Sequence, residues 1–430
     1  MRYTVGCAAG PSPRRNPHRN LRHGPQPTPR RSPPLPSDEL TPFLWQEGRV
    51  PTFECGPPYS FEVVMLPFLY QKVLKPVLFR FDPEWVHDGF VAMGDLLGRT
   101  GAGRGLISAM YGYRGPDASV TVDGLRYRTP VVLAAGFDYN GRLAGVLPGM
   151  GFGGVEVGSV TALPTPGNDP PRLQRMVRSR SIVVNKGLRN EGVEAVTRRL
   201  DSVETPDDFV LGVSIARSNR EEAASEEGGI EDYARSLEHL VAAGVGDFYT
   251  INISCPNVHG GESFAEPQRL RKLLQRLDRV EHDRPVYAKM PINPPWEEFQ
   301  RLGDVIEAAG LQGMIIGNLN KDYESAAYPE EAPSSYQGGL SGLPCRERST
   351  ELVARSREAW GDRFTLIGCG GILSAEDAME KFQAGADLVH LISGMIFTGP
   401  HLMGEIAEAW ARESQGGALP IASGRTSGQR

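Results

Sequence analysis

From residue 118 onward, short apolar runs alternate with longer segments in which apolar residues recur every three or four positions. The short runs are continuous rather than alternating, which is typical of strands buried on both faces of a parallel sheet. Helical spacing is clearest at 228–244, 297–310 and 374–386. The predicted strands are 130–136, 153–159, 209–215, 248–254, 285–290, 313–318, 364–370 and 387–394.

Eight strands alternating with helices match the count and size of a closed barrel. We therefore predict the α/β class and a (β/α)8 TIM barrel over residues 118–412. An open doubly wound sheet is the alternative, because periodicity does not show whether the sheet closes.

A different apolar pattern precedes the barrel, within a predicted helical domain at 61–100. The stretch "MLPFLYQKVLKPVLFRFDPEWVHDGFVAMGDLLG", residues 65–98, has large apolar residues at helical spacing, with Lys72, Lys75 and Arg80 between them. It predicts either an amphipathic helix packed on the barrel or a helix lying in a membrane interface with its basic residues at the headgroups. No apolar run in the sequence is long enough to span a bilayer.

The two ends of the chain have the composition of disordered segments. Residues 1–37 contain seven Arg, no Lys and no acidic residue, with many prolines. We predict a disordered Pro/Arg-rich leader at 1–60 and a disordered tail at 413–430. The leader has the charge of a transit peptide, but its prolines oppose an amphipathic helix. Upstream sequence before a start at Met65 explains it equally well.

Overall composition narrows the classes of function. A net charge of −6 with 23% charged residues gives no indication of nucleic-acid binding. The five cysteines, Cys7, Cys55, Cys255, Cys345 and Cys369, have neither zinc-site nor disulfide spacing. We expect a reducing compartment, no metal site and a free thiol at Cys255.

Polar residues stand at the carboxyl ends of the predicted strands. They are Asp138 and Tyr139, Ser159, Ser214, then Asn252, Cys255 and Asn257, followed by Lys289, Asn318 and Ser393, the last of which precedes Gly394. In a barrel these ends meet at one rim, which is where barrel enzymes place their active sites. The pattern predicts a single site built from many strands.

Three glycine-rich stretches lie around the last strands: "GGLSG" (338–342), "GCGGI" (368–372) and "ISGMIFTGP" (392–400). Barrels often bind a phosphate at this corner through backbone N–H groups. The first strand is not followed by G-x-G-x-x-G, which argues against a nicotinamide dinucleotide. Lys289, within the buried run "YAKM", is either a lysine with a buried stem or a cation facing negative charge on the pyrimidine side of a reduced flavin.

Taken together, "LAAGFDYNG", "GFGGVEVGSVT", "PTPGNDPPR", "INISCPN", "YAKM", "GGLSG", "GCGGI" and "ISGMIFTGP" resemble the dihydroorotate dehydrogenase family in order and spacing, from about residue 65 to 412. The resemblance implies an FMN-binding barrel. "FRFDPEWVH" is similar to the membrane-associated, quinone-using class, in which two helices form a hydrophobic tunnel to the flavin. It favours peripheral membrane contact through residues 65–98, at the cytoplasmic face of the inner membrane, with a cytoplasmic location as the alternative.

The resemblance also implies roles for individual residues. Cys255 occupies the position of the catalytic base, which takes a proton from the carbon next to the one that loses hydride. Asn252, Asn257 and Asn318 would hold a planar pyrimidine through amide hydrogen bonds. The implied FMN contacts are Ala135, Gly136, Ser159, Ser214, Asn252, Lys289, Gly342, Gly371, Ser393 and Gly394.

Several positions depart from the family pattern. Cys255 replaces the Ser usual in the quinone class, and Ser214 replaces an Asn. Tyr139 and Val184 replace a Lys and an Asn that bind substrate. A charge-assisted contact contributes roughly 1.5–3 kcal/mol, so this double loss should weaken binding unless Lys186 or Arg189 supplies a cation.

The function expected from these features is FMN-dependent oxidation of dihydroorotate to orotate in de novo pyrimidine biosynthesis, with electrons passed to a quinone. One alternative is a related FMN oxidoreductase acting on another dihydropyrimidine. The other is a non-catalytic flavin-binding paralogue, which Cys255 and Lys289 argue against.

Overall fold

The computed structural model describes residues 61–254, 264–335 and 337–416, with no account of the side chains of 61–64. Eight parallel strands close into a barrel in the order β10-β12-β13-β3-β4-β7-β8-β9, and β9 pairs with β10 to complete the ring. The strands are β3 (Val131–Leu133), β4 (Gly154–Val160), β7 (Val210–Ile215), β8 (Phe248–Asn252), β9 (Val286–Met290), β10 (Gly313–Ile316), β12 (Thr365–Cys369) and β13 (Leu388–Leu391). Each lies within a predicted apolar run, except that β4 extends one residue further. The TIM barrel is confirmed and the open sheet is wrong.

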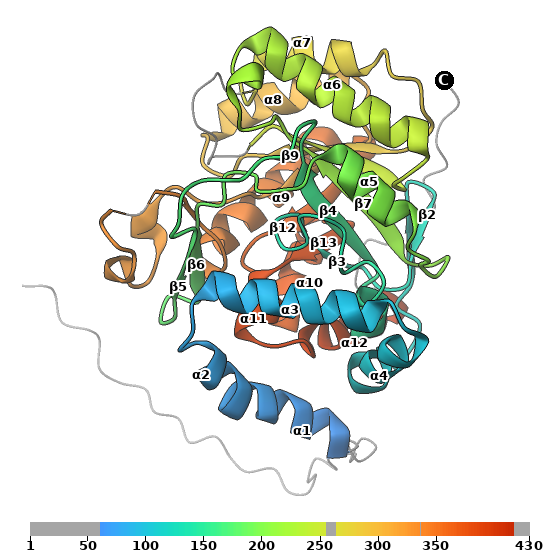
Figure 1. The fold of residues 1–430 in the computed structure, drawn as a ribbon, viewed down its shortest axis with the longest axis vertical. Coiled ribbons are helices and arrows are strands. Elements are labelled where there is room, and N and C mark those ends of the chain that lie inside the picture. The colour runs from blue at the N-terminus through green and yellow to red at the C-terminus, as the bar shows by residue number, and fades with distance from the viewer. Residues whose placement is uncertain (1–60, 255–263, 336, 417–430) are drawn as a thin grey trace, which may run out of the picture. The chain divides into compact units, whose positions relative to one another are not determined.

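Helices cover the barrel because each has one apolar face. They are α5 (Val193–Asp201), α6 (Glu226–Ala243), α7 (Pro267–Leu277), α8 (Trp296–Ala308), α9 (Arg346–Trp360), α10 (Ala375–Gln383) and α12 (Leu402–Gln415). Figure 1 shows α6, α7 and α8 together on one side of the strands. α12 continues three residues into the segment predicted as a tail, with Trp410 and Ala411 buried against the core.

A hairpin that the sequence reading missed closes the amino-terminal end of the barrel. β1 (Val120–Val122) and β2 (Leu125–Tyr127) pair through a turn at Asp123 and Gly124, both with positive φ. The Asp123 carboxylate accepts hydrogen bonds from the Tyr287 hydroxyl and the Thr365 hydroxyl, both at 2.7 Å. The hairpin is thereby tied to two barrel strands.

A second small sheet stands at the opposite end. β5 (Leu173–Met176), β6 (Ser181–Val184) and β11 (Gly339–Leu340) form an antiparallel sheet in which Val184 pairs with both Leu173 and Gly339. This sheet holds the loop 185–190 next to the glycine-rich segment that follows β10.

The amino-terminal helical segment is divided into several helices. It consists of α1 (Phe61–Leu69), a π-helical turn (Tyr70–Leu74), α2 (Lys75–Leu78), α3 (Pro83–Gly98) and α4 (Gly101–Tyr111). The chain breaks before α3 because Asp82 caps it, accepting the N–H groups of Glu84 and Trp85 at 2.9 Å. α4 lies beyond the predicted boundary at residue 100.

α3 packs closely on the barrel at two glycines. A Cβ atom at Gly94 would lie 2.5 Å from Leu143 Cδ2, and one at Gly98 would lie 3.2 Å from the backbone nitrogen of Val146. Among the described helices none is long and apolar enough to cross a bilayer. The predictions for residues 1–60 and 417–430 lie outside the described residues.

Candidate functional site

A cavity of about 570 Å³ joins the carboxyl end of the barrel to the helical segment. At its barrel end it is lined by the polar side chains of Ser159, Asn252, Lys289, Asn318, Ser341 and Ser393. The helical segment supplies an apolar wall of Leu74, Leu78, Phe79, Val86, Phe90, Met93, Leu97, Ile107 and Met110. One cavity thus has a polar end and an apolar end.

Most of the predicted site residues meet in this cavity. Ala135, Gly136, Ser159, Asn252, Lys289, Asn318 and Ser393 line it. Ser214, Gly342, Gly371 and Gly394 do not line it, and Cys255 and Asn257 lie outside the described residues. Asp138, which the sequence placed among the rim residues, instead accepts the backbone N–H groups of Arg142 and Leu143 and so holds its own loop.

Hydrogen bonds connect the polar residues across neighbouring strands. The Ser159 hydroxyl lies 2.8 Å from that of Ser214 and accepts a 2.8 Å hydrogen bond from the Asn252 amide. Ser214 therefore supports the cavity from below. The Asn318 side-chain amide donates to the Ser254 hydroxyl at 2.8 Å, and that hydroxyl donates in turn to Oδ1 of the Asn252 side chain at 3.3 Å. These contacts orient the two asparagines that face the cavity.

Lys289, which lines the cavity, belongs to a buried charged group whose other members, Glu156 and His390, do not line it. Its ammonium lies 3.6 Å from Oε2 of Glu156, which also lies 3.4 Å from His390 Nδ1 and accepts the N–H of Ala135 at 3.0 Å. The Glu156 and His390 side chains are both 0% exposed. Burial acts to raise the pKa of Glu156, but Lys289, His390 and the Ala135 N–H outweigh it and lower that pKa to about 2. Burial lowers the pKa of His390, and the neighbouring Glu156 opposes that shift.

The late glycines pack against backbone. A Cβ at Gly342 would lie 2.3 Å from the Arg180 oxygen, and one at Gly394 would lie 2.2 Å from the Ile372 oxygen. Both Gly342 and Gly371 have positive φ, at 72° and 76°. The three glycine-rich loops are therefore held close together, and Ser341 and Ser393 from two of them are 2.9 Å apart.

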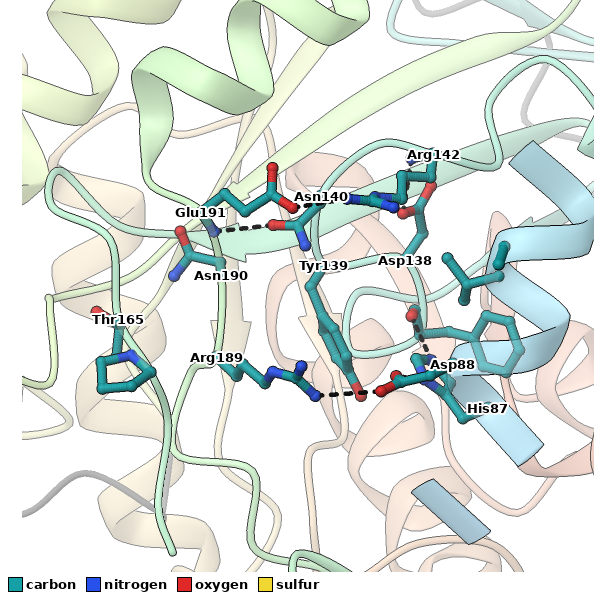
Figure 2. A pocket seen from close by; sticks show the side chains of 14 residues that line it. His87, Asp88, Asp138, Tyr139, Asn140, Arg142, Thr165, Arg189, Asn190 and Glu191 are labelled. Carbon is teal, nitrogen blue, oxygen red and sulfur yellow. Dashed lines mark hydrogen bonds and ion pairs between the residues drawn. The ribbon is translucent and has the colours of Figure 1, made fainter. Parts of the chain in front are cut away.

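Tyr139 and Val184, the two departures from the family pattern, both line the cavity. The Tyr139 ring packs against His87, with 5.2 Å between ring centroids, and the Lys186 ammonium lies 5.1 Å from the centre of the Tyr139 ring. Burial raises the pKa of Tyr139, so its hydroxyl stays protonated. Figure 2 shows this ring reaching toward Asp88 and Arg189.

A second cavity of about 410 Å³ is also lined by Tyr139. It shares His87, Phe137, Tyr139 and Arg189 with the first cavity. Tyr139 therefore lines both cavities, and Figure 2 shows it among the residues that line the second one.

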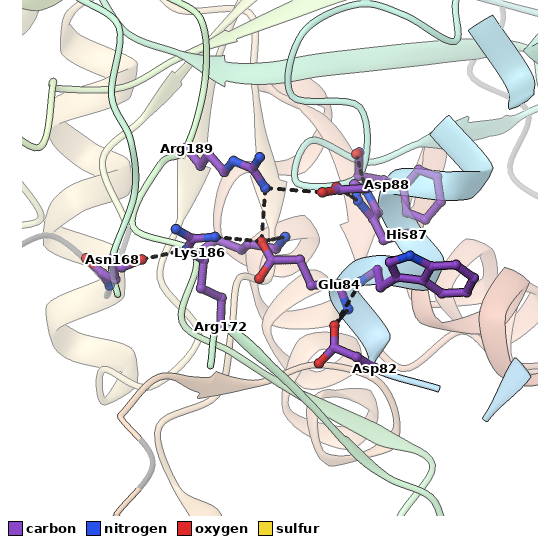
Figure 3. A network of polar contacts seen from close by, with 10 residues as sticks. Asp82, Glu84, His87, Asp88, Asn168, Arg172, Lys186 and Arg189 are labelled. Atoms are coloured by element: carbon purple, nitrogen blue, oxygen red, sulfur yellow. Dashed lines mark hydrogen bonds and ion pairs between the residues drawn. The ribbon is translucent and has the colours of Figure 1, made fainter. Parts of the chain in front are cut away.

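Lys186 belongs to an ionic cluster at the start of α3, shown in Figure 3. Oε1 of Glu84 accepts hydrogen bonds from Lys186 at 2.9 Å and from Arg172 and Arg189 at 3.0 Å each. Arg189 also lies 3.4 Å from Asp88. Burial raises the pKa of Glu84, but its hydrogen bonds and charge interactions with Lys186 and Arg172 lower it by more, so Glu84 is ionised.

The polar end of the large cavity fits the donors and acceptors of a flavin. The amide of Asn252 and the ammonium of Lys289 suit the pyrimidine edge of the ring, and Ser341 and Ser393 at the glycine-rich loops suit a phosphate. Gly136 leaves this face open, since a Cβ there would meet only Ile392 Cδ1, at 3.7 Å.

The sequence reading missed four contributors to this end: Glu156, His390, Ser254 and Ser341. Two of them lay in motifs already singled out, since Ser254 precedes Cys255 and Ser341 lies within "GGLSG". Glu156 is a carboxylate inside an apolar run, and such a residue needs a buried partner. Nothing local in the sequence marked His390 as its neighbour.

Comparisons with known proteins agree with this geometry. Residues 117–412 match the family model described as dihydroorotate dehydrogenase. A protein from Chelativorans sp. (strain BNC1) named dihydroorotate dehydrogenase (quinone) is 33% identical over 361 residues, which cover 82% of this chain and 94% of the relative. One of the same name from Thermobifida fusca (strain YX) is 35% identical over 341 residues, 77% of this chain and 89% of the relative. The crystal structure of DHODH from Eimeria tenella in complex with ferulenol superimposes with a TM-score of 0.69 at 25% identity, covering 80% of this chain and 97% of that one.

Proposed function

The chain belongs to the dihydroorotate dehydrogenase family, and from this premise we propose that it oxidises dihydroorotate to orotate with FMN and passes the electrons to a quinone. The observation that carries the proposal is the single cavity that is polar at the barrel rim and apolar between the helices. A planar polar substrate and a lipophilic acceptor both need access to one redox group, and this cavity offers a suitable environment to each.

At the polar end we assign FMN to Ala135, Gly136, Ser159, Asn252, Lys289 and Ser393, with Ser214, Gly342, Gly371 and Gly394 behind them. Bound FMN would supply a hydride acceptor. The Lys289 ammonium, held by Glu156, faces this end as a fixed positive charge.

Asn252 and Asn318 are assigned to the substrate ring, together with Asn257. Their orientation by Ser159 and Ser254 supports this role, since a preoriented amide loses less freedom when a ligand binds. We assign the proton abstraction to Cys255, in the segment after β8. A positioned base contributes roughly 10²–10⁴-fold to such a step.

The apolar end is assigned to the quinone. Large apolar side chains on α1–α4 are exposed on the surface around it, including Phe68, Leu69, Val73, Trp85 and Leu96. We propose that this surface lies in a membrane interface, at the cytoplasmic face of the inner membrane, so that the quinone enters the cavity from the lipid.

A related oxidoreductase for a dihydropyrimidine without a carboxylate is the second candidate. It is favoured by Tyr139 and Val184, which place an aromatic ring and an aliphatic side chain in the cavity wall.

Anaerobic reduction of the purified protein distinguishes the two. Bleaching of the bound flavin by dihydroorotate, followed by reoxidation with a short-chain quinone, is the expected result. Bleaching by dihydrouracil alone would support the second candidate, and a protein that binds no flavin would refute both. Cys255→Ala should bind the flavin normally and be reduced far more slowly, whereas Cys255→Ser should be reduced faster than Cys255→Ala.

A further inference from the structure

Three cations converge on one carboxylate oxygen at the edge of the large cavity. Lys186, Arg172 and Arg189 all lie within 3.0 Å of Oε1 of Glu84. The only other carboxylate that contacts this cluster among the described residues is Asp88, which lies 3.4 Å from Arg189. Three positive charges therefore face two negative charges, and the cluster carries one excess positive charge.

The excess charge is partly shielded from water. The side chain of Lys186 is 7% exposed, that of Glu84 is 15% exposed and that of Arg172 is 17% exposed. The Arg189 side chain is 40% exposed, so the shielding applies to Lys186 and Arg172. A buried cation needs a nearby anion, and here these two share a single carboxylate oxygen with Arg189. A second carboxylate placed at this cluster would be stabilised.

Only two of the three cations line the large cavity, where a ligand could contact them. Lys186 and Arg189 line the large cavity together with Asn252, Asn318 and Lys289, whereas Arg172 does not line it. The Tyr139 ring lies beside the Lys186 ammonium at 5.1 Å and limits the directions from which an anion can approach it. A ligand in the cavity would therefore meet Lys186 and Arg189, but not Arg172.

We propose that Lys186, assisted by Arg189, binds the carboxylate of the substrate, and that Glu84 occupies this position when no ligand is bound. This inference rests on the proposed function and adds the residues that select a carboxylate. In the family pattern a Lys at position 139 binds the substrate, and this chain has Tyr139 there. Lys186 would supply the missing positive charge. Because Glu84 belongs to α3, the ligand and the helix would compete for the same ammonium.

Ligand titrations followed by the flavin absorbance band test the proposal, using orotate and its neutral methyl ester. In Lys186→Gln we expect orotate binding to weaken by roughly 10- to 100-fold, as the loss of one charge-assisted contact implies, with little change for the ester. The matched control is Arg172→Gln, which removes an equivalent hydrogen bond to Glu84 outside the cavity. It should leave the affinity for orotate near that of the unmodified protein.

The possible results distinguish a cluster that binds the substrate carboxylate from one that only docks α3. If Lys186→Gln weakens orotate and ester equally, or if Arg172→Gln weakens orotate as much as Lys186→Gln does, the cluster only docks α3 and the inference is wrong. Glu84→Gln removes the proposed competitor and should tighten orotate binding severalfold. An unchanged or weaker affinity in that variant would overturn the competition.

The same titrations also distinguish a failure of this inference from a failure of the proposed function. An unmodified protein whose flavin responds to neither orotate nor dihydroorotate would refute the function itself. An unmodified protein that binds orotate, together with a Lys186→Gln variant that binds it equally well, would refute only the role of Lys186.

Discussion

Replacing Glu156 by Gln should destabilise the barrel strongly, because it removes the fully buried carboxylate that faces the nearly buried ammonium of Lys289. Gln has nearly the same shape and can still accept the N–H of Ala135, so the substitution removes mainly the charge. Glu156 is fully buried, and its pKa falls from the ordinary 4.5 to about 2 in the folded protein.

This change in the pKa of Glu156 gives the size of the expected loss in folding free energy. A fall from 4.5 to about 2 corresponds to about 3 kcal/mol of folding free energy. Breaking one side of a buried ion pair typically costs about 3–5 kcal/mol. The two values agree, and we expect Glu156→Gln to lose about 3 kcal/mol near neutral pH. Because the folded pKa is the lower one, the contribution is complete above pH 4.5 and is lost as the pH falls toward 2.

Urea unfolding followed by circular dichroism measures this loss. Free FMN should be varied and its contribution extrapolated to zero, since a ligand that binds the folded state adds stability of its own. The double variant Glu156→Gln/Lys289→Met removes both charges and should recover most of the lost stability. A Glu156→Gln protein within about 1 kcal/mol of the unmodified protein, or a double variant less stable than either single one, would refute the reasoning.

Three further predictions concern the helical segment and the loop beside it. Val86→Trp should obstruct the apolar end and slow flavin reoxidation by a short-chain, water-soluble quinone on the order of 10²-fold, the cost of misplacing a reactant by ~1 Å. Dihydroorotate should still bleach the flavin in stopped-flow measurements. Trp85→Ala, on the exposed side of α3, should leave both rates unchanged with this quinone, which does not have to enter from a membrane. Ion pairing lowers the pKa of Glu84 below its ordinary 4.5. The protection of α3 from hydrogen exchange, corrected for intrinsic exchange rates, should therefore hold above about pH 4.5 and decline below it. Protection that declines instead as the pH rises would contradict the ion-pair account. Gly187→Ala should lower the free energy of unfolding in urea by roughly 2 kcal/mol or more, because φ is 64° and the added Cβ would lie 2.6 Å from the backbone nitrogen of Asn168. The control Gly124→Ala, with φ at 79° and open space around it, should lower it by only about 1 kcal/mol. Equal losses would mean that close packing around Gly187 is unimportant.

The barrel could be predicted from the sequence because its strands are buried on both faces and so leave continuous apolar runs. β1 and β2 left a signal that the reading passed over: alternating residues around the Asp-Gly pair at 123–124, which is typical of a hairpin. β5, β6 and β11 are only two to four residues long, too short for periodicity to indicate them.

The site was predictable only where its residues follow strands directly. Strand ends brought Ser159, Asn252, Lys289 and Asn318 into one cavity as expected. The Glu84 cluster could not be predicted, because its three cations lie 88, 102 and 105 positions from the carboxylate. Long-range pairing of this kind depends on where α3 docks, and no local pattern encodes it.

The hydrogen-bonded ring of β-strands closes without any residue from the first four helices. Mutations on the inner surface of those helices can therefore accumulate without opening the ring. Because the proposed acceptor site is built from these helices, a change of acceptor would need changes in the helices and none at the rim. Grafting the helices of a distant homologue onto this barrel should accordingly exchange acceptor preference and leave orotate formation intact.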